Sequence, residues 1–327
     1  MQKTKLALGG TILAAIGWFF FQNYEVTKDF SIRAKSSSTT TSTSNTELPA
    51  PAEGESIRIA TFNIQILGKE KVSKPHVLEA LAKICGQFDV VAIQELRDKD
   101  SAEATIQKLV AAIKSATGRT MAYVLGPRLG LTSSKEQYVF LYDEASILCD
   151  AQQVYTVEDP EHLIHRPPLV ALFRARKPSP EQAFTFILAN IHTDPDMAVA
   201  ETSAMQLVLD AVRNDGRNED DVLLLGDFNT SNKKVGRLGE VRGLTDVIKN
   251  EPTTPDGKQQ YDHIFFLASA TKEFSRGGII DTVRALNLTI EQAYEISDHC
   301  PVWGEFSIYE GGAPSALATR TPANASR

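Results

Sequence analysis

Short apolar segments alternate along the chain with longer segments in which apolar residues recur every three or four positions. The short segments, such as Ile57–Ile64 and Val90–Ile93, are rich in β-branched residues and predict buried strands. Pro75 is placed to open a helix, and a second helical pattern runs from about Met197 to Val212. Further strands are expected at Tyr138–Tyr142, Leu169–Phe173, Phe184–Ile191, Val222–Leu225, Ile264–Leu267 and Val302–Ile308. The alternation predicts an α/β domain in which helices cover largely buried sheets.

The N-terminal segment, residues 1–24, has a different pattern. Lys3 and Lys5 precede an apolar run at residues 6–21, and no small-residue cleavage site follows it directly. We therefore expect an uncleaved signal anchor that holds the chain to a membrane, with the rest of the protein outside the cytoplasm. A cleaved signal peptide is the alternative, and the protein would then be secreted.

The composition divides the remaining chain into three parts. Residues 25–56 are rich in Ser, Thr and Pro and predict a flexible linker. Residues 57–308 are expected to form one folded domain without internal repeats, and residues 309–327 a disordered tail. The formal net charge of −7 argues against a broad basic face that binds polyanions. If the substrate is a polyanion, metal ions and a few arginines must offset the electrostatic repulsion. Three cysteines are too sparse for a disulfide framework.

Polar side chains that can bind a metal ion or a phosphate stand at the ends of the apolar strands. They are Asn63, Glu95, His192, Asp227 with Asn229, Asp262 with His263, and Asp298 with His299. Each has an ordinary alternative: Glu95 can be the first solvated residue after a strand, and Asp227 with Asn229 an Asx turn. Together they favour one active site at one edge of the sheets. Each histidine would then need an orienting carboxylate.

Seven motifs, in this order along the chain, resemble the endonuclease/exonuclease/phosphatase superfamily and are most similar to deoxyribonuclease I. They are Ile59–Ile64, Ile93–Asp98, Lys135–Tyr138, Ile191–His192 with Ala198–Glu201, Gly226–Asn229, Tyr261–Ile264 and Ser297–His299. The resemblance covers nearly all of residues 57–308. It implies a four-layer α/β sandwich, in which two packed, mixed and mainly antiparallel β-sheets are flanked by helices.

The same resemblance implies catalytic roles for six residues. His192 would pair with Glu136 and His299 with Asp262, while the phosphate and the attacking water would be oriented by Asp227 and Asn229. One histidine would act as general base, and the other would protonate the leaving 3′ oxygen. Which histidine has which role stays open, and some schemes for this superfamily assign water activation to the aspartate that matches Asp227.

The resemblance also implies a metal ion and two substrate contacts. Glu95 would be the principal ligand of Mg²⁺, with Asn63 and Asp298 close by and Mn²⁺ as the alternative metal. Arg97 and Arg166 would contact the DNA substrate. The products would carry 5′-phosphate and 3′-hydroxyl ends.

The sequence also departs from deoxyribonuclease I. Leu131 and Ser134 replace an arginine and a tyrosine that help to hold DNA, and His263 stands where an arginine often follows the Tyr–Asp pair. Both disulfides of that family are missing. The loop near Asp159 is shortened, which leaves Ca²⁺ binding open.

The leading hypothesis is therefore a membrane-tethered, Mg²⁺-dependent endonuclease that cuts DNA. Sphingomyelinases, inositol-phosphate phosphatases and abasic-site endonucleases use the same constellation and are the alternatives for substrate. The apolar N-terminal anchor argues against an abasic-site repair enzyme, which should not carry one. A lipid phosphodiesterase should expose an apolar hairpin for docking. Arg97, kept in its motif, favours DNA as the substrate. An inactive binding module would have lost residues of the centre, whereas this chain keeps them. No protein partner is inferred.

Overall fold

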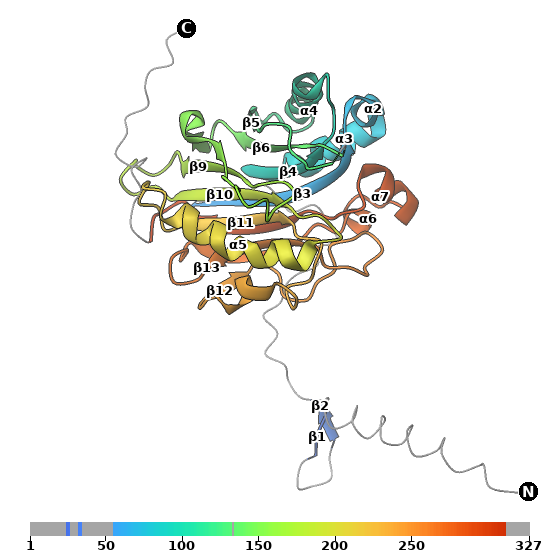
Figure 1. The fold of residues 1–327 in the computed structure, drawn as a ribbon. Coiled ribbons are helices and arrows are strands. Elements are labelled where there is room, and N and C mark those ends of the chain that lie inside the picture. Colours follow the sequence, from blue (N-terminus) through green and yellow to red (C-terminus); the bar gives the residue numbers. More distant parts are fainter. Residues whose placement is uncertain (1–23, 27–31, 35–54, 133, 312–327) are drawn as a thin grey trace, which may run out of the picture. The chain divides into compact units, whose positions relative to one another are not determined.

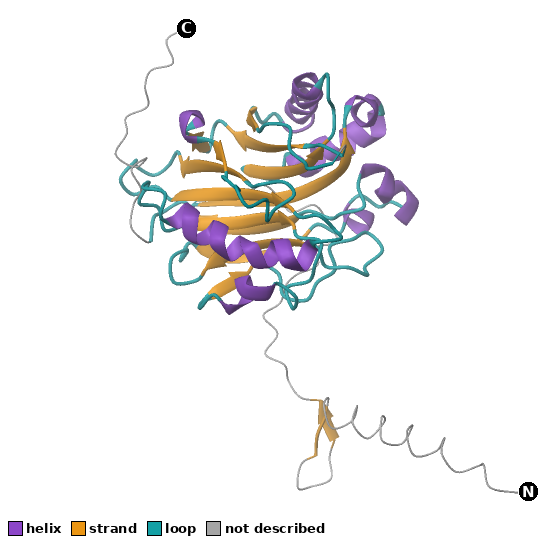
Figure 2. Cartoon of the chain, viewed as in Figure 1, coloured by secondary structure: helices purple, strands orange, loops and turns teal. Residues whose placement is uncertain are grey.

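Two β-sheets pack face to face, and helices cover their outer faces (Figures 1 and 2). This arrangement comes from a computed structural model that describes residues 24–26, 32–34, 55–132 and 134–311. The four-layer sandwich predicted from the sequence is thereby confirmed. The chain divides into two units, Met1–Ser42 and Thr43–Arg327. In the first, β1 (Tyr24–Val26) and β2 (Ile32–Ala34) form an antiparallel pair within the region expected to be largely linker.

The six-stranded sheet contains both ends of the folded domain. Its strands, in spatial order, are β14 (Phe274–Ile279), β15 (Val302–Ser307), β3 (Ser56–Leu67), β4 (Val90–Leu96), β6 (Gln137–Asp143) and β5 (Met121–Leu125). Only β3 and β4 are parallel neighbours among them. The helices α2 (Lys69–Ser73), α3 (Pro75–Cys85) and α4 (Ala102–Thr117) follow β3 and β4 in the chain. Pro75 is the first residue of α3, as its position in the sequence predicts.

The seven-stranded sheet is formed by the middle of the chain. Its main path is β12 (Leu244–Asp246), β13 (Asp262–Leu267), β11 (Val222–Asp227), β10 (Thr185–His192), β9 (Leu169–Ala175) and β7 (Ile147–Cys149), and β8 (Tyr155–Thr156) also pairs with β9. Here β10 and β11 are the parallel neighbours. The helix α5 (Ala198–Arg213) covers this sheet (Figure 1). The other helices of the described residues are η1 (Ala151–Gln153), η2 (Gly236–Glu240), α6 (Thr282–Ala285) and α7 (Ile290–Ile296).

Alternating side chains of the strands fill three separate hydrophobic layers. Along β3, Ile57 and Ile59 enter the layer between the two sheets, whereas Phe62 and Ile64 enter the layer under α3 and α4. Along β10, Phe186 enters the central layer, and the residues on the other face pack against α5. Since both faces of the inner strands are buried, these strands are apolar almost throughout, and this is why the sequence shows continuous apolar segments there. A polar residue within or after such a strand is therefore conspicuous.

The predicted anchor at residues 6–21 lies outside the described residues, as does the tail after Gly311. Within residues 24–26, 32–34, 55–132 and 134–311, no helix combines the length and apolar character needed to cross a bilayer.

Candidate active site

The parallel strand pair in each sheet brings polar residues together at one edge of the sandwich. In the seven-stranded sheet, His192 at the end of β10 lies in register with Asp227 at the end of β11. In the six-stranded sheet, Asn63 of β3 lies in register with Gln94 of β4. Because parallel strands end on the same side, these side chains meet at one edge. The amide Nδ2 of Asn63 donates a hydrogen bond of 2.9 Å to Oδ2 of Asp227 and so joins the two sheets.

Glu95 is directed into the site by an irregularity of the backbone. Its φ is +64°, a left-handed conformation that side-chain-bearing residues rarely adopt, and the pairing of β4 with β6 shifts register between Ile93 and Leu96. Its carboxylate accepts hydrogen bonds from the backbone of Ile66 (3.0 Å) and from Nδ2 of Asn63 (3.3 Å). Strained backbone of this kind clusters at functional sites. The β-bulge therefore favours a functional role for Glu95 over the alternative that it is only the first solvated residue after a strand.

Gly226 allows β10 and β11 to approach each other beside His192 and Asp227. Its φ is +150°, and a Cβ at this position would lie 1.8 Å from the carbonyl oxygen of Ile191. No other residue type fits this close approach. The Gly-Asp-Phe-Asn motif thus contains one residue needed for packing next to two needed for chemistry.

His192 is held on several sides. Its Nδ1 donates to Oε1 of Glu136 over 2.6 Å, its backbone N–H donates to the hydroxyl of Tyr138, and its carbonyl accepts from the guanidinium of Arg166. Burial disfavours the charged imidazole, but the carboxylates of Glu136 and Asp227 outweigh this and raise the pKa of His192. Conversely, the pKa of Glu136 is held below its usual value despite burial, chiefly because His192 is beside it.

His299 has a matching environment built from different segments. Its Nδ1 donates to Oδ2 of Asp262 over 2.8 Å, and the hydroxyl of Thr253 donates to the same oxygen over 2.7 Å. The backbone N–H of His299 donates to the hydroxyl of Ser297. Burial again disfavours the charged ring, but Asp262 and Asp227 outweigh it and raise the pKa of His299 to about 10. The two histidines are therefore arranged alike, each with a carboxylate on Nδ1.

Asp227 lies between the two histidines. Its Oδ2 is 3.5 Å from Nε2 of His192 and 3.4 Å from Nε2 of His299. Its Oδ1 accepts a hydrogen bond of 2.9 Å from the backbone of Asn229, whose own side chain donates to the carbonyl of Thr193. The Nε2 atoms of both imidazoles thus point to one carboxylate. Two imidazoles so placed could act as general acid and general base on one bound group.

Oxygen atoms of two predicted metal ligands lack hydrogen-bond partners in the part of the chain that the structure describes. Oδ1 of Asn63 is buried and has no hydrogen-bond partner among the described residues, and the same is true of Oδ1 of Asp298. The other oxygen of Asp298 is held by Nε2 of Gln65 at 2.9 Å. With Glu95, these residues form a set of carboxylate and amide oxygens without cysteine, which Mg²⁺ prefers. At this edge, the His, Cys, Asp or Glu ligand atoms that lie within 4.8 Å of one another among the described residues belong to Asp227, Asp262 and His299, so the set implied by the resemblance stays a prediction.

The two predicted substrate arginines have different surroundings. Arg97 is partly exposed, and its guanidinium lies 3.3 Å from Glu95 and 3.6 Å from Glu136. Arg166 is only 4% exposed, and it donates to the backbone carbonyls of His192 and Thr193. The visible contacts of Arg166 hold the histidine segment in place, and its contact with substrate stays a prediction. Leu131 is exposed.

Several supporting residues escape sequence reasoning. Gln94 donates to Oδ1 of Asn190 over 2.6 Å, and Asn190 donates to carbonyls of β4 and β6, so a buried polar network links the sheets behind the site. The sequence does mark Gln94 and Asn190, because each is a polar residue next to or inside an apolar run. Tyr138 and Thr253 carry no such signal, since each is recognisable only by the group that it contacts.

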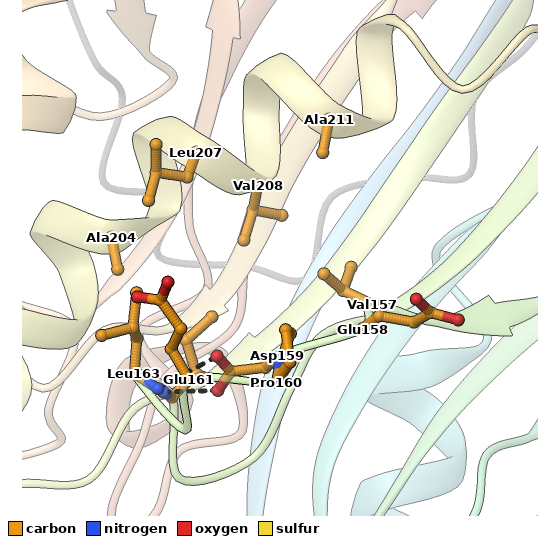
Figure 3. A pocket seen from close by; sticks show the side chains of 11 residues that line it. Val157, Glu158, Asp159, Pro160, Glu161, Leu163, Ala204, Leu207, Val208 and Ala211 are labelled. Atoms are coloured by element: carbon orange, nitrogen blue, oxygen red, sulfur yellow. Dashed lines mark hydrogen bonds between the residues drawn. The ribbon is translucent and has the colours of Figure 1, made fainter.

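A cavity of about 270 Å³ lies between α5 and the loop at residues 157–164 and is separate from this site (Figure 3). Its lining includes Leu163 and Val208 but none of the candidate site residues. Asp159 accepts hydrogen bonds from the backbone of Leu163 and Ile164, at 3.0 and 2.8 Å, and so shapes the loop itself (Figure 3).

Comparison with known proteins gives consistent matches. The model of the Endonuclease/Exonuclease/phosphatase family matches residues 60–299. Deoxyribonuclease-1-like 2 of Mus musculus is 31% identical over 78% of this chain and 93% of its own length. Deoxyribonuclease gamma of Homo sapiens is 27% identical over 79% of this chain and 88% of its own.

Solved structures share the fold at lower identity. The human Nocturnin catalytic domain superposes with a TM-score of 0.54 at 13% identity, covering 78% of this chain and 94% of its own. An endonuclease/exonuclease/phosphatase family protein from Bacteroides thetaiotaomicron superposes with a TM-score of 0.52 at 18% identity, covering 76% and 94%.

Proposed function

The chain belongs to the endonuclease/exonuclease/phosphatase family, and on that premise we propose that it is a Mg²⁺-dependent endonuclease that hydrolyses DNA to 5′-phosphate and 3′-hydroxyl ends. One observation carries the proposal. Two histidine–carboxylate pairs direct their Nε2 atoms to Asp227, at 3.5 and 3.4 Å. The named relatives that support DNA as substrate are deoxyribonucleases.

The proposed metal site consists of Glu95, Asn63 and Asp298. Mg²⁺, or Mn²⁺ in its place, would neutralise charge on the phosphoryl oxygens during attack by water. Oδ1 of Asn63 and Oδ1 of Asp298 have no hydrogen-bond partner among the described residues, which supports this assignment, although Oδ1 of Asp298 lies 3.8 Å from Nε2 of His299. Arg97 beside Glu95 adds positive charge at the edge of the same site, where a phosphate would enter.

The proposed proton transfers use the Nε2 atoms of the two histidines. Glu136 and Asp262 each accept the Nδ1 proton of their partner, which leaves Nε2 as the atom that takes or delivers a proton. One imidazole takes the proton of the attacking water, and the other gives a proton to the leaving 3′ oxygen. Asp227 and Asn229, joined by a hydrogen bond, orient the water and the phosphate between them.

The surroundings of the site support transient rather than tight binding of DNA. The chain carries a formal net charge of −7, and the exposed Leu131 and Ser134 occupy positions where deoxyribonuclease I has an arginine and a tyrosine. Substrate attraction must then come from the metal ion, Arg97 and Arg166. Because few phosphate contacts release few counterions, we expect activity to fall only modestly as the salt concentration rises.

We also propose that the enzyme works outside the cytoplasm. The proposal rests on the apolar run at residues 6–21 and on the Ser/Thr-rich residues 25–56 that follow it. The run would anchor the domain to a membrane through a linker, and cleavage within the N-terminus would release it as a secreted enzyme. Fractionation of cells that express the full-length chain distinguishes the two forms.

The substrate is tested by offering several phosphoesters to one preparation. The full-length protein, in mild detergent, is incubated with supercoiled plasmid, sphingomyelin vesicles and an inositol phosphate, each with Mg²⁺ or EDTA. We expect Mg²⁺-dependent nicking of the plasmid, lost in EDTA and in His192→Ala. An intact plasmid together with a cleaved lipid or inositol phosphate would overturn the assignment to DNA.

A further inference from the structure

A second group of acidic side chains lies at the end of β11 opposite to Asp227. Glu219, Asp220 and Asp221 directly precede the strand. Asp227 ends the same strand, and a rise of about 3.3 Å per residue places Asp221 and Asp227 about 20 Å apart. The group is thus distinct from the candidate active site and plays no part in the chemistry proposed there.

Three distant segments of the chain contribute to this group. Asp221 precedes β11, Glu273 precedes β14, and Glu310 follows β15. Their carboxylate oxygens lie within 4.8 Å of one another, and so do those of Glu219, Asp220 and Asp221. Glu310 is tied to β10 as well, because its Oε2 accepts a hydrogen bond of 3.0 Å from the backbone of Thr185.

The central carboxylate of the group is fully buried and lacks partners. Asp221 is 0% exposed, and neither of its carboxylate oxygens has a hydrogen-bond partner among the described residues. One oxygen each of Glu219 and Glu273, both nearly as buried, is also without a partner there. In the part of the chain that the structure describes, no salt bridge joins Glu219, Asp221 or Glu273 to a basic side chain. Burying several unpaired carboxylates is costly unless a counter-charge is supplied.

Burial and mutual repulsion act on these groups in the same direction. Burial raises the pKa of Glu219 to about 8, and burial together with the charge of Glu273 raises the pKa of Asp221 to about 9. The pKa of Glu273 is raised as well, chiefly by burial. The hydroxyl of Thr271, itself buried, lies beside Asp221 and acts against this rise. The side chains of the group offer only oxygen atoms.

We propose that Asp221, Glu273 and Glu310, with Glu219 beside them, hold a structural Ca²⁺ ion. Calcium takes six to eight oxygen ligands in flexible geometry and accepts carboxylates in one- or two-oxygen contact. The group contains no histidine or cysteine, which zinc and the softer metals prefer. Mg²⁺ usually keeps several of its waters, and the burial of Asp221 does not favour that.

The ion would fasten the last described residues to the centre of the seven-stranded sheet. Glu310 and Gly311 follow the final strand, and Gly311 donates its backbone N–H to Glu273. A cation bridging Glu310 to Asp221 would hold this end of the chain against the start of β11. Its effect is on stability and not on the catalytic step.

Thermal unfolding of the full-length protein tests the site. The metal-stripped protein is unfolded with and without millimolar Ca²⁺ as wild type, Asp221→Asn, Glu95→Ala and Glu144→Gln. Glu95→Ala removes a ligand of the candidate catalytic metal, and Glu144→Gln neutralises an exposed acid elsewhere. At about a hundredfold excess of Ca²⁺ over its Kd, we expect Tm to rise by about 5 °C or more in all except Asp221→Asn.

Three results would overturn the proposal. Wild type with no rise in Tm would show that the carboxyl groups share protons instead of a cation. An equal rise in Asp221→Asn would show that the ion does not bind at Asp221, and a rise lost in Glu95→Ala would place it at the active site. If Asp221→Asn does not fold, Glu310→Gln, at a half-buried position, replaces it with the same expected loss of the Ca²⁺ response.

Discussion

The hydrogen bond between His192 and Glu136 joins the two sheets of the sandwich. Glu136 directly precedes β6 of the six-stranded sheet, and His192 ends β10 of the seven-stranded sheet; their Nδ1 and Oε1 atoms are 2.6 Å apart. The bond between His299 and Asp262 crosses in the opposite sense, from the start of β15 to the start of β13. Correct packing of the sheets therefore orients both imidazoles.

The first prediction concerns Glu136 as a positioning residue. Glu136→Gln keeps the shape but removes the charge that orients His192 and raises its pKa. We expect kcat for plasmid nicking to fall about 10- to 100-fold with little change in KM. The limb of the pH profile that reports His192 should also move to lower pH. Steady-state kinetics over a pH series measures both, with Glu144→Gln as control. An unshifted profile would argue against this role.

The second prediction concerns the close approach of β10 and β11. Gly226→Ala forces a Cβ into the carbonyl of Ile191 and should lower the free energy of unfolding by about 3 kcal/mol or more. Gly118→Ala is the matched control, since Gly118 also has a positive φ but a Cβ added there would meet no atom within 4 Å. Gly118→Ala should lower the free energy of unfolding by only about 1–2 kcal/mol. Denaturant titration compares the two variants, and equal losses would refute the steric argument.

The third prediction concerns pH and a buried histidine outside the reaction. Burial opposes a charge on His263, but Asp246 (2.8 Å from Nδ1) outweighs it, and the carbonyl of Thr230 adds to the rise in the pKa of His263. The folded protein therefore holds this proton more tightly than the unfolded chain, whose histidine titrates near its ordinary pKa of about 6.5. The stabilisation is complete below that value and is lost as pH rises through the higher folded pKa.

His263→Gln should remove this contribution. The free energy of unfolding is measured for both proteins from about pH 6 to about pH 9, across the ordinary histidine range. We expect the difference between wild type and variant to shrink as pH rises. A difference that stays constant over this range would mean that His263 is not charged in the folded protein.

Local sequence patterns locate individual residues of the site but not their partners. Asn63, Glu95 and His192 stand out because each follows an apolar run, and this depends only on neighbours in the chain. The strands of Asn63 and Glu95 extend further than expected, to Leu67 and Leu96. The partner of His192 lies 56 positions away on the other sheet, and no periodicity encodes that distance. The resemblance to a family alone supplied Glu136, and it alone paired Asp262, which the strand pattern had already located, with His299.

Other features depend on three-dimensional packing alone. The left-handed backbone of Glu95 follows from a register shift, which composition does not reveal. Asp221, Glu273 and Glu310 lie far apart in the sequence, yet the fold gathers them at one end of β11. The resemblance implies that Arg166 contacts substrate, whereas in the structure it is largely buried and donates to the backbone carbonyl of His192. The burial of a side chain and its contacts with residues distant in the sequence depend on the fold, so local sequence patterns do not predict them.

The rate of plasmid nicking by wild type, His192→Ala and His299→Ala tests the central claim most directly. Thermal unfolding first confirms that all three full-length proteins are folded. In Mg²⁺, each substitution should lower the rate about 10²- to 10⁴-fold, the range expected for loss of a general acid or base. EDTA should abolish the wild-type rate, and DNA ligase alone should reseal the nicks. A wild-type rate in either variant, or nicking that persists without a divalent metal, would contradict the account.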